Sequence, residues 1–438
     1  MNSKSLNLDQ APPLQVPLRF FLTAPLFGIA AGLLLVWQGG NLFVVPLSHY
    51  TVALTHLITL GFISMVIFGA LYQIVPVLVG SLMPWVWLAW LVHSGLIVGV
   101  VALVGGLLLI SPILLQLALI ALGVAFLVFL FQLGLALART PSLNVTVYSI
   151  GLAVLSLVFT VSLGLVSVWQ FGFEPLGLSR TTLTAIHVYL ALGGWLGAMI
   201  TGVGYSVLPM FYLATPFPAS RSWLVLIFQT LAIITGVLTA LLAESQIWHM
   251  VPLAFASVAA VIFASTVFGT LRGRRRKIID TTLRFWYVGI CCLLLSLVFL
   301  AIYNIFPHPN WLLVFGVLFL LGFVAAIIYG MLFKIVAFLI WLHRFSKLAG
   351  KVNVPLLKDI IPPRPTVWQW WSFLLMMVMM LAAAVTGNDI LARLAGLGMV
   401  AAFGGLWLIL LVASRFRPDL EPMKPNNPAG LSPETMRT

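Results

Sequence analysis

Two histidines stand inside long apolar stretches of this chain, and their type and position predict chemistry better than any other residues do. His56 lies in the segment 55–62 and His187 in the segment 185–190. An ionisable or ligating side chain surrounded by hydrocarbon is costly, so it marks a functional hypothesis. Imidazole nitrogens bind copper, zinc and heme iron, and the two positions therefore predict a metal or heme site.

The composition places those histidines in a membrane protein. Hydrophobic residues make up 62% of the 438 residues and charged residues only 7%, which is too little charge to cover a soluble globule. The net charge of +13 comes from basic residues spread over segments that flank apolar stretches. We therefore expect a polytopic membrane protein surrounded by the lipid bilayer, with no nucleic acid as a partner.

Twelve apolar stretches are long enough to cross a bilayer, which takes about 20 residues in a helix. Their approximate limits are 18–38, 48–76, 85–108, 112–137, 145–168, 181–209, 222–243, 250–270, 284–305, 311–340, 368–386 and 390–413. The sequence thus predicts an all-α polytopic membrane protein of about twelve transmembrane helices. These form a single membrane domain, residues 1–438, that ends in a polar tail, 414–438.

Charged residues divide unequally between the two sides of this topology. One side holds most of the Lys and Arg residues, including the runs 272–277 and 344–364. The other side holds few charges, which are Arg180, Arg393, Glu174, Glu244 and Asp389. Cytoplasmic loops carry an excess of Lys and Arg. We therefore expect both termini to be cytoplasmic, in a protein of the cell inner membrane.

A short phrase recurs three times within the apolar stretches. In each copy two glycines stand eight residues apart, and they are Gly61 and Gly69, Gly194 and Gly202, and Gly322 and Gly330. The copies are 133 and 128 residues apart, and four spans separate each copy from the next. The recurrence predicts three parallel four-helix arcs with pseudo-threefold symmetry. The repeat units would be about 17–138, 145–271 and 283–413.

The repeat alignment sets the predicted geometry of the two histidines. His187 stands two positions from Tyr189, which is the equivalent of His56. Two residues along an α-helix give a rotation of about 200° and a rise of about 3 Å. The imidazoles would then face each other at similar depth between the second and sixth spans, as bis-histidine ligation of a b-type heme requires. Small residues should line such a porphyrin, and the candidates are Gly61, Ser64, Gly193, Gly194 and Gly197.

Two other interpretations of the histidines stay open. His49 precedes His56 by seven residues and shares its helix face, so His49, His56 and His187 would form a copper or zinc site. The remaining interpretation is structural, with both histidines bonded to helix carbonyls or to each other through water. One charged residue also occurs within a repeat, because Lys334 aligns with Gln73 and Ser206. We expect Lys334 to extend towards the cytoplasmic surface.

Twelve spans in three parallel arcs of four is the arrangement of heme–copper oxidase subunit I. The segments 55–62 and 185–190 resemble the histidine-bearing second-helix motif of the C-type oxidase and nitric oxide reductase branch. They also resemble the related NnrS-like and truncated oxidase-like membrane proteins. The resemblance implies heme b, with copper as a further cofactor, and His56 and His187 as ligands. It implies a role in respiratory electron transfer or in the response to nitric oxide, with a cytochrome or another respiratory subunit as partner.

The chain departs from that family where oxygen chemistry would need residues. It has no adjacent pair of histidines, its tenth span has none, and Val317 stands at the equivalent of His56. We therefore expect a protein without a complete oxygen-reducing binuclear centre, and the sequence leaves open whether it is an enzyme. Two other functions are kept as alternatives: a multi-pass transporter or copper-handling permease, and an assembly subunit of a respiratory complex.

Overall fold

The computed structural model describes residues 12–174, 176–243, 245–275 and 277–420, and the regular structure in those ranges is helical. Twelve helices there are long and apolar enough to cross a membrane, so the predicted all-α polytopic membrane fold is confirmed. The predicted tail 414–438 lies outside the described residues from position 421 onward.

Each of the three arcs consists of four spans. The first comprises α1 (Gln15–Gln38), the second span α2 (His49–His56), η3 (Leu57–Ser64) and α3 (Met65–Leu78), then α4 (Ala89–Leu109) and α5 (Pro112–Ala138). The second comprises α6 (Val145–Gly172), the sixth span α7 (Arg180–Val188), η5 (Tyr189–Ala198) and α8 (Met199–Tyr212), then α9 (Ala219–Leu242) and α10 (Met250–Arg272). The third comprises α11 (Thr281–Ile305), the tenth span α12 (Pro309–Gly316), η7 (Val317–Ala325) and α13 (Ala326–Arg344), then α15 (Pro363–Thr386) and α16 (Asp389–Ser414).

Polar residues at the ends of the apolar stretches determine where several helices begin. Six of them accept a hydrogen bond from a backbone N–H of the first helical turn, and they are Ser48, Asn144, Ser179, Asp280, His308 and Asn388. These bonds satisfy donors that have no partner inside the helix. The apolar sequence that follows each cap stays helical because lipid offers no hydrogen bonds to the backbone.

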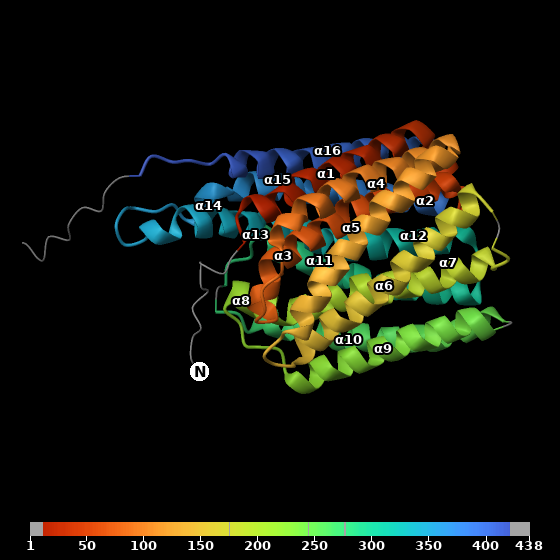
Figure 1. The fold of residues 1–438 in the computed structure, drawn as a ribbon, viewed down its shortest axis with the longest axis horizontal. Helices are drawn as coiled ribbons and strands as arrows, with labels where there is room; N and C mark the ends of the chain where they lie inside the picture. The colour runs from red at the N-terminus through yellow and green to blue at the C-terminus, as the bar shows by residue number, and fades with distance from the viewer. Residues whose placement is uncertain (1–11, 175, 244, 276, 421–438) are drawn as a thin grey trace, which may run out of the picture.

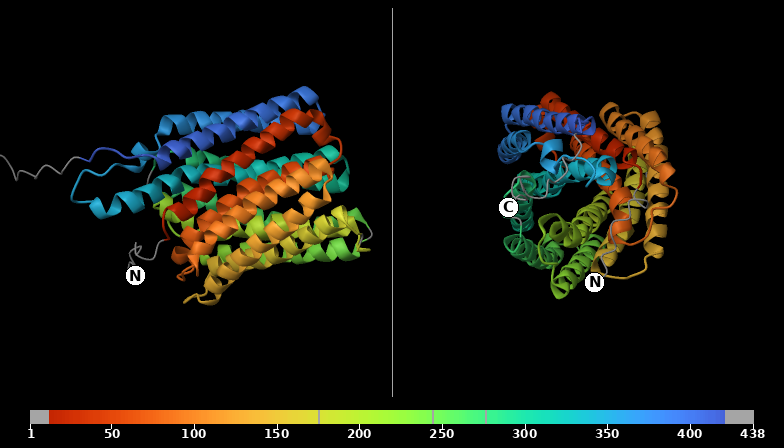
Figure 2. Two further views of the ribbon diagram at one scale, coloured as in Figure 1. Left: turned by 45° about the horizontal axis from the view of Figure 1, so that its top comes forward. Right: turned by 90° about the vertical axis from the view of Figure 1, so that its left-hand side faces the viewer.

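The outer spans follow one another round the bundle in chain order (Figure 1, Figure 2). α1 lies beside α16, so the first and last spans close the ring. Their backbones meet at two glycines, since a Cβ built on Gly32 would lie 2.8 Å from the carbonyl oxygen of Gly396. Small residues at a crossing let helices approach closely in lipid, where no hydrophobic force drives them together.

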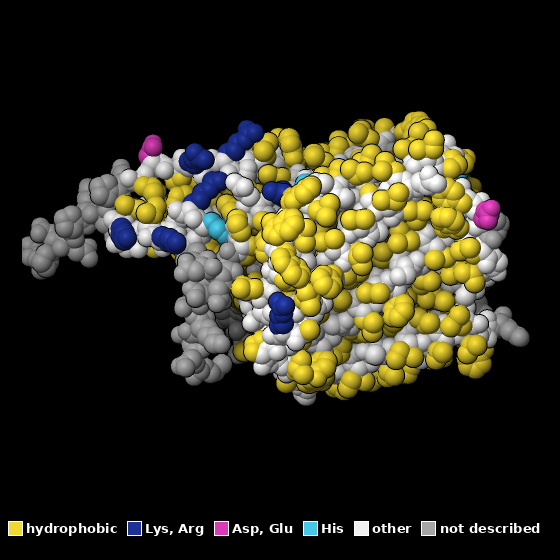
Figure 3. All heavy atoms as spheres, viewed as in Figure 1, with side chains coloured by type: hydrophobic (Ala, Val, Ile, Leu, Met, Phe, Trp, Pro, Cys, Tyr) yellow, Lys and Arg dark blue, Asp and Glu magenta, His cyan; other side chains and the backbone are white. Residues whose placement is uncertain are grey.

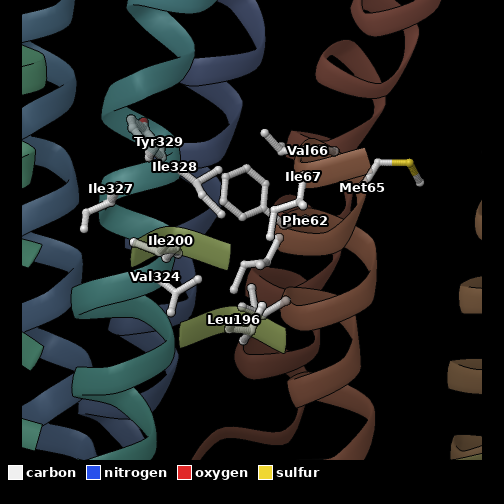
Figure 4. Close-up of a cluster of buried hydrophobic side chains, with 14 of the residues drawn as sticks. Phe62, Met65, Val66, Ile67, Leu196, Ile200, Val324, Ile327, Ile328 and Tyr329 are labelled. Carbon is white, nitrogen blue, oxygen red and sulfur yellow. The ribbon is translucent and has the colours of Figure 1, made fainter. Parts of the chain in front are cut away.

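The second, sixth and tenth spans form the centre of the bundle. Figure 4 shows buried side chains of all three meeting there, with Phe62 from the second span, Leu196 and Ile200 from the sixth, and Val324 and Ile328 from the tenth. The remaining spans surround this cluster. The apolar core therefore joins the three arcs through their equivalent spans.

Each central span contains a π-helical segment at the same position of the repeat. The segments η3, η5 and η7 each include the first glycine of a pair: Gly61, Gly194 and Gly322. A π-turn closes on the fifth residue instead of the fourth, so it holds one residue more than an α-turn. The sequence analysis did not predict these segments, because the apolar runs carry no residue signal that separates π-helix from α-helix.

The π segments explain why the paired glycines are eight residues apart. In every arc they pack against two residues of the first span that are only seven apart, and the contacts are Gly61 with Phe27 and Gly69 with Phe20, Gly194 with Ser156 and Gly202 with Ser149, and Gly322 with Cys292 and Gly330 with Phe285. Positions seven apart share one face of an α-helix. The extra residue of the π segment brings positions eight apart onto one face too, so both glycines meet their partners.

The two ends of the bundle differ in charge. The end with the connections 273–280 and 345–362 is rich in Lys and Arg and is called the basic end below (Figure 3, left). The opposite end carries Glu174 and Asp389, whereas Glu244 lies outside the described residues. Hydrophobic side chains cover most of the surface between the ends on the face drawn in Figure 3. This pattern is typical of a membrane protein.

A methyl group added at a repeated glycine should destabilise the protein. In Gly69→Ala the new Cβ would lie 2.6 Å from Cβ of Phe20, and in Gly330→Ala it would lie 2.5 Å from Cβ of Phe285. Because backbone must shift to relieve either overlap, we expect each change to lower the free energy of unfolding by about 1–3 kcal/mol. Thermal unfolding of the purified protein in detergent measures the loss.

Gly134→Ala and Gly151→Ala are matched controls, because a Cβ at either helical position meets no atom within 4 Å. Alanine is the better helix former, so the Tm of these variants should stay unchanged or rise slightly. Equal destabilisation in all four variants would contradict the packing role of the repeated glycines.

Candidate metal centre

His56 and His187 both stand where an α-helix passes into a π-helix. His56 is the last residue of α2, directly before η3, and His187 is the last but one of α7, before η5. Each follows its helix cap, Ser48 or Ser179, by eight residues, so the two lie at similar depth in the half of the bundle away from the basic end. π-Helical segments occur frequently at functional sites.

The structure brings these two imidazoles together, as the repeat alignment predicts. Their ring centroids are 6.3 Å apart and their planes are inclined by 38°. A metal ion about 2 Å from a nitrogen lies about 3 Å from the ring centroid, so two imidazoles on opposite sides of one ion have centroids about 6 Å apart. A bridging water gives about the same separation, whereas a direct hydrogen bond between the rings gives about 5 Å. The observed separation leaves room for one atom between the two rings.

Hydrogen bonds fix the tautomer of both rings. Nδ1 of His56 lies 2.8 Å from the carbonyl oxygen of Val52, and Nδ1 of His187 lies 3.0 Å from that of Thr160. A carbonyl only accepts, so Nδ1 carries the proton in each ring, and Nε2 of the neutral imidazole has a free lone pair. Neither Nε2 has a hydrogen bond within the described part of the chain. Histidines that ligate metals are held in this way, with the other ring nitrogen bonded to a carbonyl.

The ring of His187 packs against the neighbouring helix α6. A Cβ at Gly164 would lie 3.3 Å from Cε1 of His187, so the glycine leaves room for the ring. Thr160, four residues earlier, offers its carbonyl oxygen to the ring, while its own hydroxyl is buried without a partner among the described residues. Buried polar atoms are rarely left unpaired in proteins. The unpaired hydroxyl is that of Thr160, the same residue whose carbonyl oxygen orients the His187 ring.

The three-histidine alternative gains no support from the described residues. No group of three His, Cys, Asp or Glu side chains is gathered there at metal-binding distance. His49 is the first residue of α2, about two turns from His56, and its ring lies against that of Tyr50 with centroids 4.1 Å apart. Of the three predicted ligands, His56 and His187 are the two whose rings lie together in the described structure.

The five small residues predicted to line a porphyrin differ in their surroundings. Gly61 meets Phe27, Gly194 meets Ser156, and Ser64 accepts a hydrogen bond from Trp195. Gly193 and Gly197, in contrast, line a cavity together with Thr201 and Gln229. The heme b expected from the sequence therefore stays a prediction.

A second histidine contact was not anticipated from the sequence. The hydroxyl of Tyr189 lies 2.7 Å from Nδ1 of His249, and the two rings are nearly parallel at 6°. Gly236 makes room for the tyrosine, because a Cβ there would lie 2.5 Å from its ring. One feature of the sequence pointed to Tyr189 as a candidate for such a contact, because Tyr189 aligns with His56 in the repeat. The pair links η5 to the first residues of the eighth span.

Lys334 reaches the basic end, where it takes part in a polar cluster. Its Nζ forms an ion pair of 2.6 Å with Oδ2 of Asp280 and lies 3.6 Å from the ring centroid of Tyr212. Oδ1 of Asp280 accepts hydrogen bonds from the Tyr212 hydroxyl and from the backbone N–H of Leu283, so the carboxylate also caps α11. The cluster joins the second and third arcs. The sequence analysis singled out Lys334 and missed Asp280.

No protein-family model matches the chain, and no curated protein matches its sequence.

Replacing the lysine of this cluster should destabilise the protein. Lys334→Met leaves the carboxylate of Asp280 without its cation at a site where the lysine side chain is only 12% exposed. We expect a loss of about 1–2 kcal/mol in the free energy of unfolding. Lys347→Met is the control, because Lys347 is exposed at the same end and its replacement should change stability by less than about 0.5 kcal/mol. Equal effects in thermal unfolding would contradict a structural ion pair.

Proposed function

We propose that this protein handles copper in a membrane, and that His56 and His187 bind one copper(I) ion between them. The observation that supports this most is the pair of oriented imidazoles. Each donates Nδ1–H to a carbonyl, each keeps a lone pair on Nε2, and the ring centroids are 6.3 Å apart. Two such nitrogens on opposite sides of one ion make a near-linear site.

The number and charge of the ligands favour copper(I) over other ions. Zinc in proteins takes four ligands, whereas copper(I), a d10 ion, is stable with two nitrogens on opposite sides. Two neutral imidazoles do not offset the charge of the ion. Because the cost of placing charge in hydrocarbon rises steeply with its magnitude, a singly charged ion is favoured over a doubly charged one.

The site suits transfer of the ion more than storage. A two-coordinate ion has open positions, so a ligand of an acceptor can bind before a histidine leaves. His56 and His187 lie in the half of the bundle away from the basic end, and we propose that copper exchanges at that side. The protein would then serve as a permease or as a copper-supplying partner in the assembly of a respiratory complex.

The electron-transfer role implied by the resemblance to heme–copper oxidase subunit I stays a prediction. The three-arc architecture and the closeness of the His56 and His187 rings are its support. The close packing of Gly61 against Phe27 and of Gly194 against Ser156 is the argument against heme b. An absorption spectrum separates the two functions, because a b-type heme has a Soret band and copper(I) has no visible colour.

The copper content of purified variants tests the proposal. Protein loaded under reducing conditions should hold one copper ion per chain, and His56→Ala and His187→Ala should each lose most of it because a single imidazole cannot retain the ion. X-ray absorption should give nitrogen ligands at about 2.0 Å. Metal analysis after gel filtration provides the count.

His93→Ala is the matched control, since Nε2 of His93 is already bonded to the hydroxyl of Thr23 at 3.0 Å. This variant should keep its copper. Full copper content in both site variants would overturn the proposed ligands, and a Soret band lost in the same variants would favour heme instead.

We propose further that both termini face the cytoplasm of a cell whose inner membrane holds the protein, because the basic end carries the excess of Lys and Arg. A fluorescent protein inserted at Gly350, in the connection 345–362, should fluoresce, and so should a fusion at Thr438, which lies outside the described residues. Alkaline phosphatase inserted at Leu178 should be active. Phosphatase activity from an insertion at Gly350 would reverse the orientation.

A further inference from the structure

A cavity of about 80 Å³ lies between the second and third arcs, and five consecutive spans, the sixth to the tenth, form its wall. The ninth and tenth spans contribute larger apolar side chains, among them Leu293 and Phe323. Six wall residues of the sixth, seventh and eighth spans are glycine or alanine, namely Gly193, Gly197, Ala232, Ala256, Ala259 and Ala260. The cavity is present because these small residues do not fill the space between the two arcs.

The two polar side chains of the wall are bonded within the wall. Nε2 of Gln229 donates a hydrogen bond of 3.2 Å to the carbonyl oxygen of Gly193, and the hydroxyl of Thr201 donates one of 3.2 Å to Oε1 of Gln229. The other side chains that line the cavity are apolar. A buried water needs two to four polar partners, whereas apolar cavities stay dry and take apolar molecules. The wall therefore favours an apolar occupant over water.

The stacked pair of Tyr189 and His249 lies about one helical turn from the cavity, on the side away from the basic end. Tyr189 precedes the wall residue Gly193 by four positions on the sixth span, and Gly236 follows Ala232 by four on the seventh. The Tyr189 ring packs at Gly236, and its hydroxyl lies 2.7 Å from Nδ1 of His249 on the eighth span. This contact joins three of the five spans that form the wall, and it covers the cavity on that side.

We propose that the cavity binds one small apolar molecule that enters from the bilayer, with at most about four heavy atoms. An apolar protein cavity of about 150 Å³ holds benzene or xenon, so about half that volume suits a molecule smaller than benzene. An empty cavity leaves atoms of its wall, such as those of Phe319 and Phe323, without contacts on one side. An occupant supplies these contacts and buries its own apolar surface. The site does not depend on copper at His56 and His187.

Crystals of the full-length protein pressurised with xenon test the site, because xenon is small, apolar and visible by anomalous scattering. We expect one xenon atom per chain, in contact with Ala260 and Phe323. Ala232→Leu and Ala260→Leu extend side chains into the cavity from α9 and α10, so each should abolish xenon binding. Thermal unfolding establishes that these variants are folded, and their Tm should not fall because the added atoms fill empty space.

Ala401→Leu is the matched control, because it adds the same atoms at an exposed position of α16. This variant should keep its xenon. In the unaltered protein, bromoethane soaked into the crystals should occupy the cavity, whereas bromobenzene should be excluded by its size. The proposal would be overturned by a cavity that holds ordered water and no xenon, by xenon that persists there in both folded filling variants, or by bromobenzene in the cavity.

Discussion

The fold depends on close packing of paired glycines against the first span of each arc. In lipid, helices associate through van der Waals contact and hydrogen bonds, so a surface without a Cβ is where two backbones approach most closely. A Cβ at Gly69 or Gly330 would overlap Phe20 or Phe285, which means that these contacts already have no spare room. The partners are seven residues apart on an α-helix, whereas the glycines are eight apart. The central spans can match that register only with one extra residue, and the π segments supply it.

The histidine site follows from this register. His56 and His187 stand at the junctions where α-helix changes to π-helix, so the same insertion that aligns the glycines also sets the directions in which the imidazoles leave their helices. Their supports differ: His56 bonds to Val52 of its own helix, whereas His187 bonds to Thr160 of the first span of its arc. The two histidines thus occupy nearly equivalent positions of the repeat but have different hydrogen-bond partners. Their rings approach each other between the second and sixth spans.

Polar chemistry in this protein arises where the three arcs differ. The position that holds His56 in the first arc holds Tyr189 in the second, which bonds to His249, and Val317 in the third. Four residues after the second glycine, Ser206 approaches the Thr146 hydroxyl at 3.4 Å, whereas Lys334 forms an ion pair with Asp280. Packing requires small residues at the same places in every arc, so those recur. Side chains at the remaining positions are free to diverge, and these polar contacts form there.

The sequence by itself determined the membrane class, the twelve spans, the threefold repeat and the two candidate histidines, because hydropathy, charge bias and spacing are properties of the chain that need no contacts. It predicted that His56 and His187 approach each other, since their offset follows from helical geometry. Only the tertiary structure decided the partners of their Nδ1 atoms, the packing of Gly61 against Phe27 and the pairing of Lys334 with Asp280. These depend on residues such as Thr160 and Phe27, whose distance in sequence hides their contacts. The π segments also belong to the tertiary structure, because an extra residue in a turn is stable only where a neighbouring helix fixes the register.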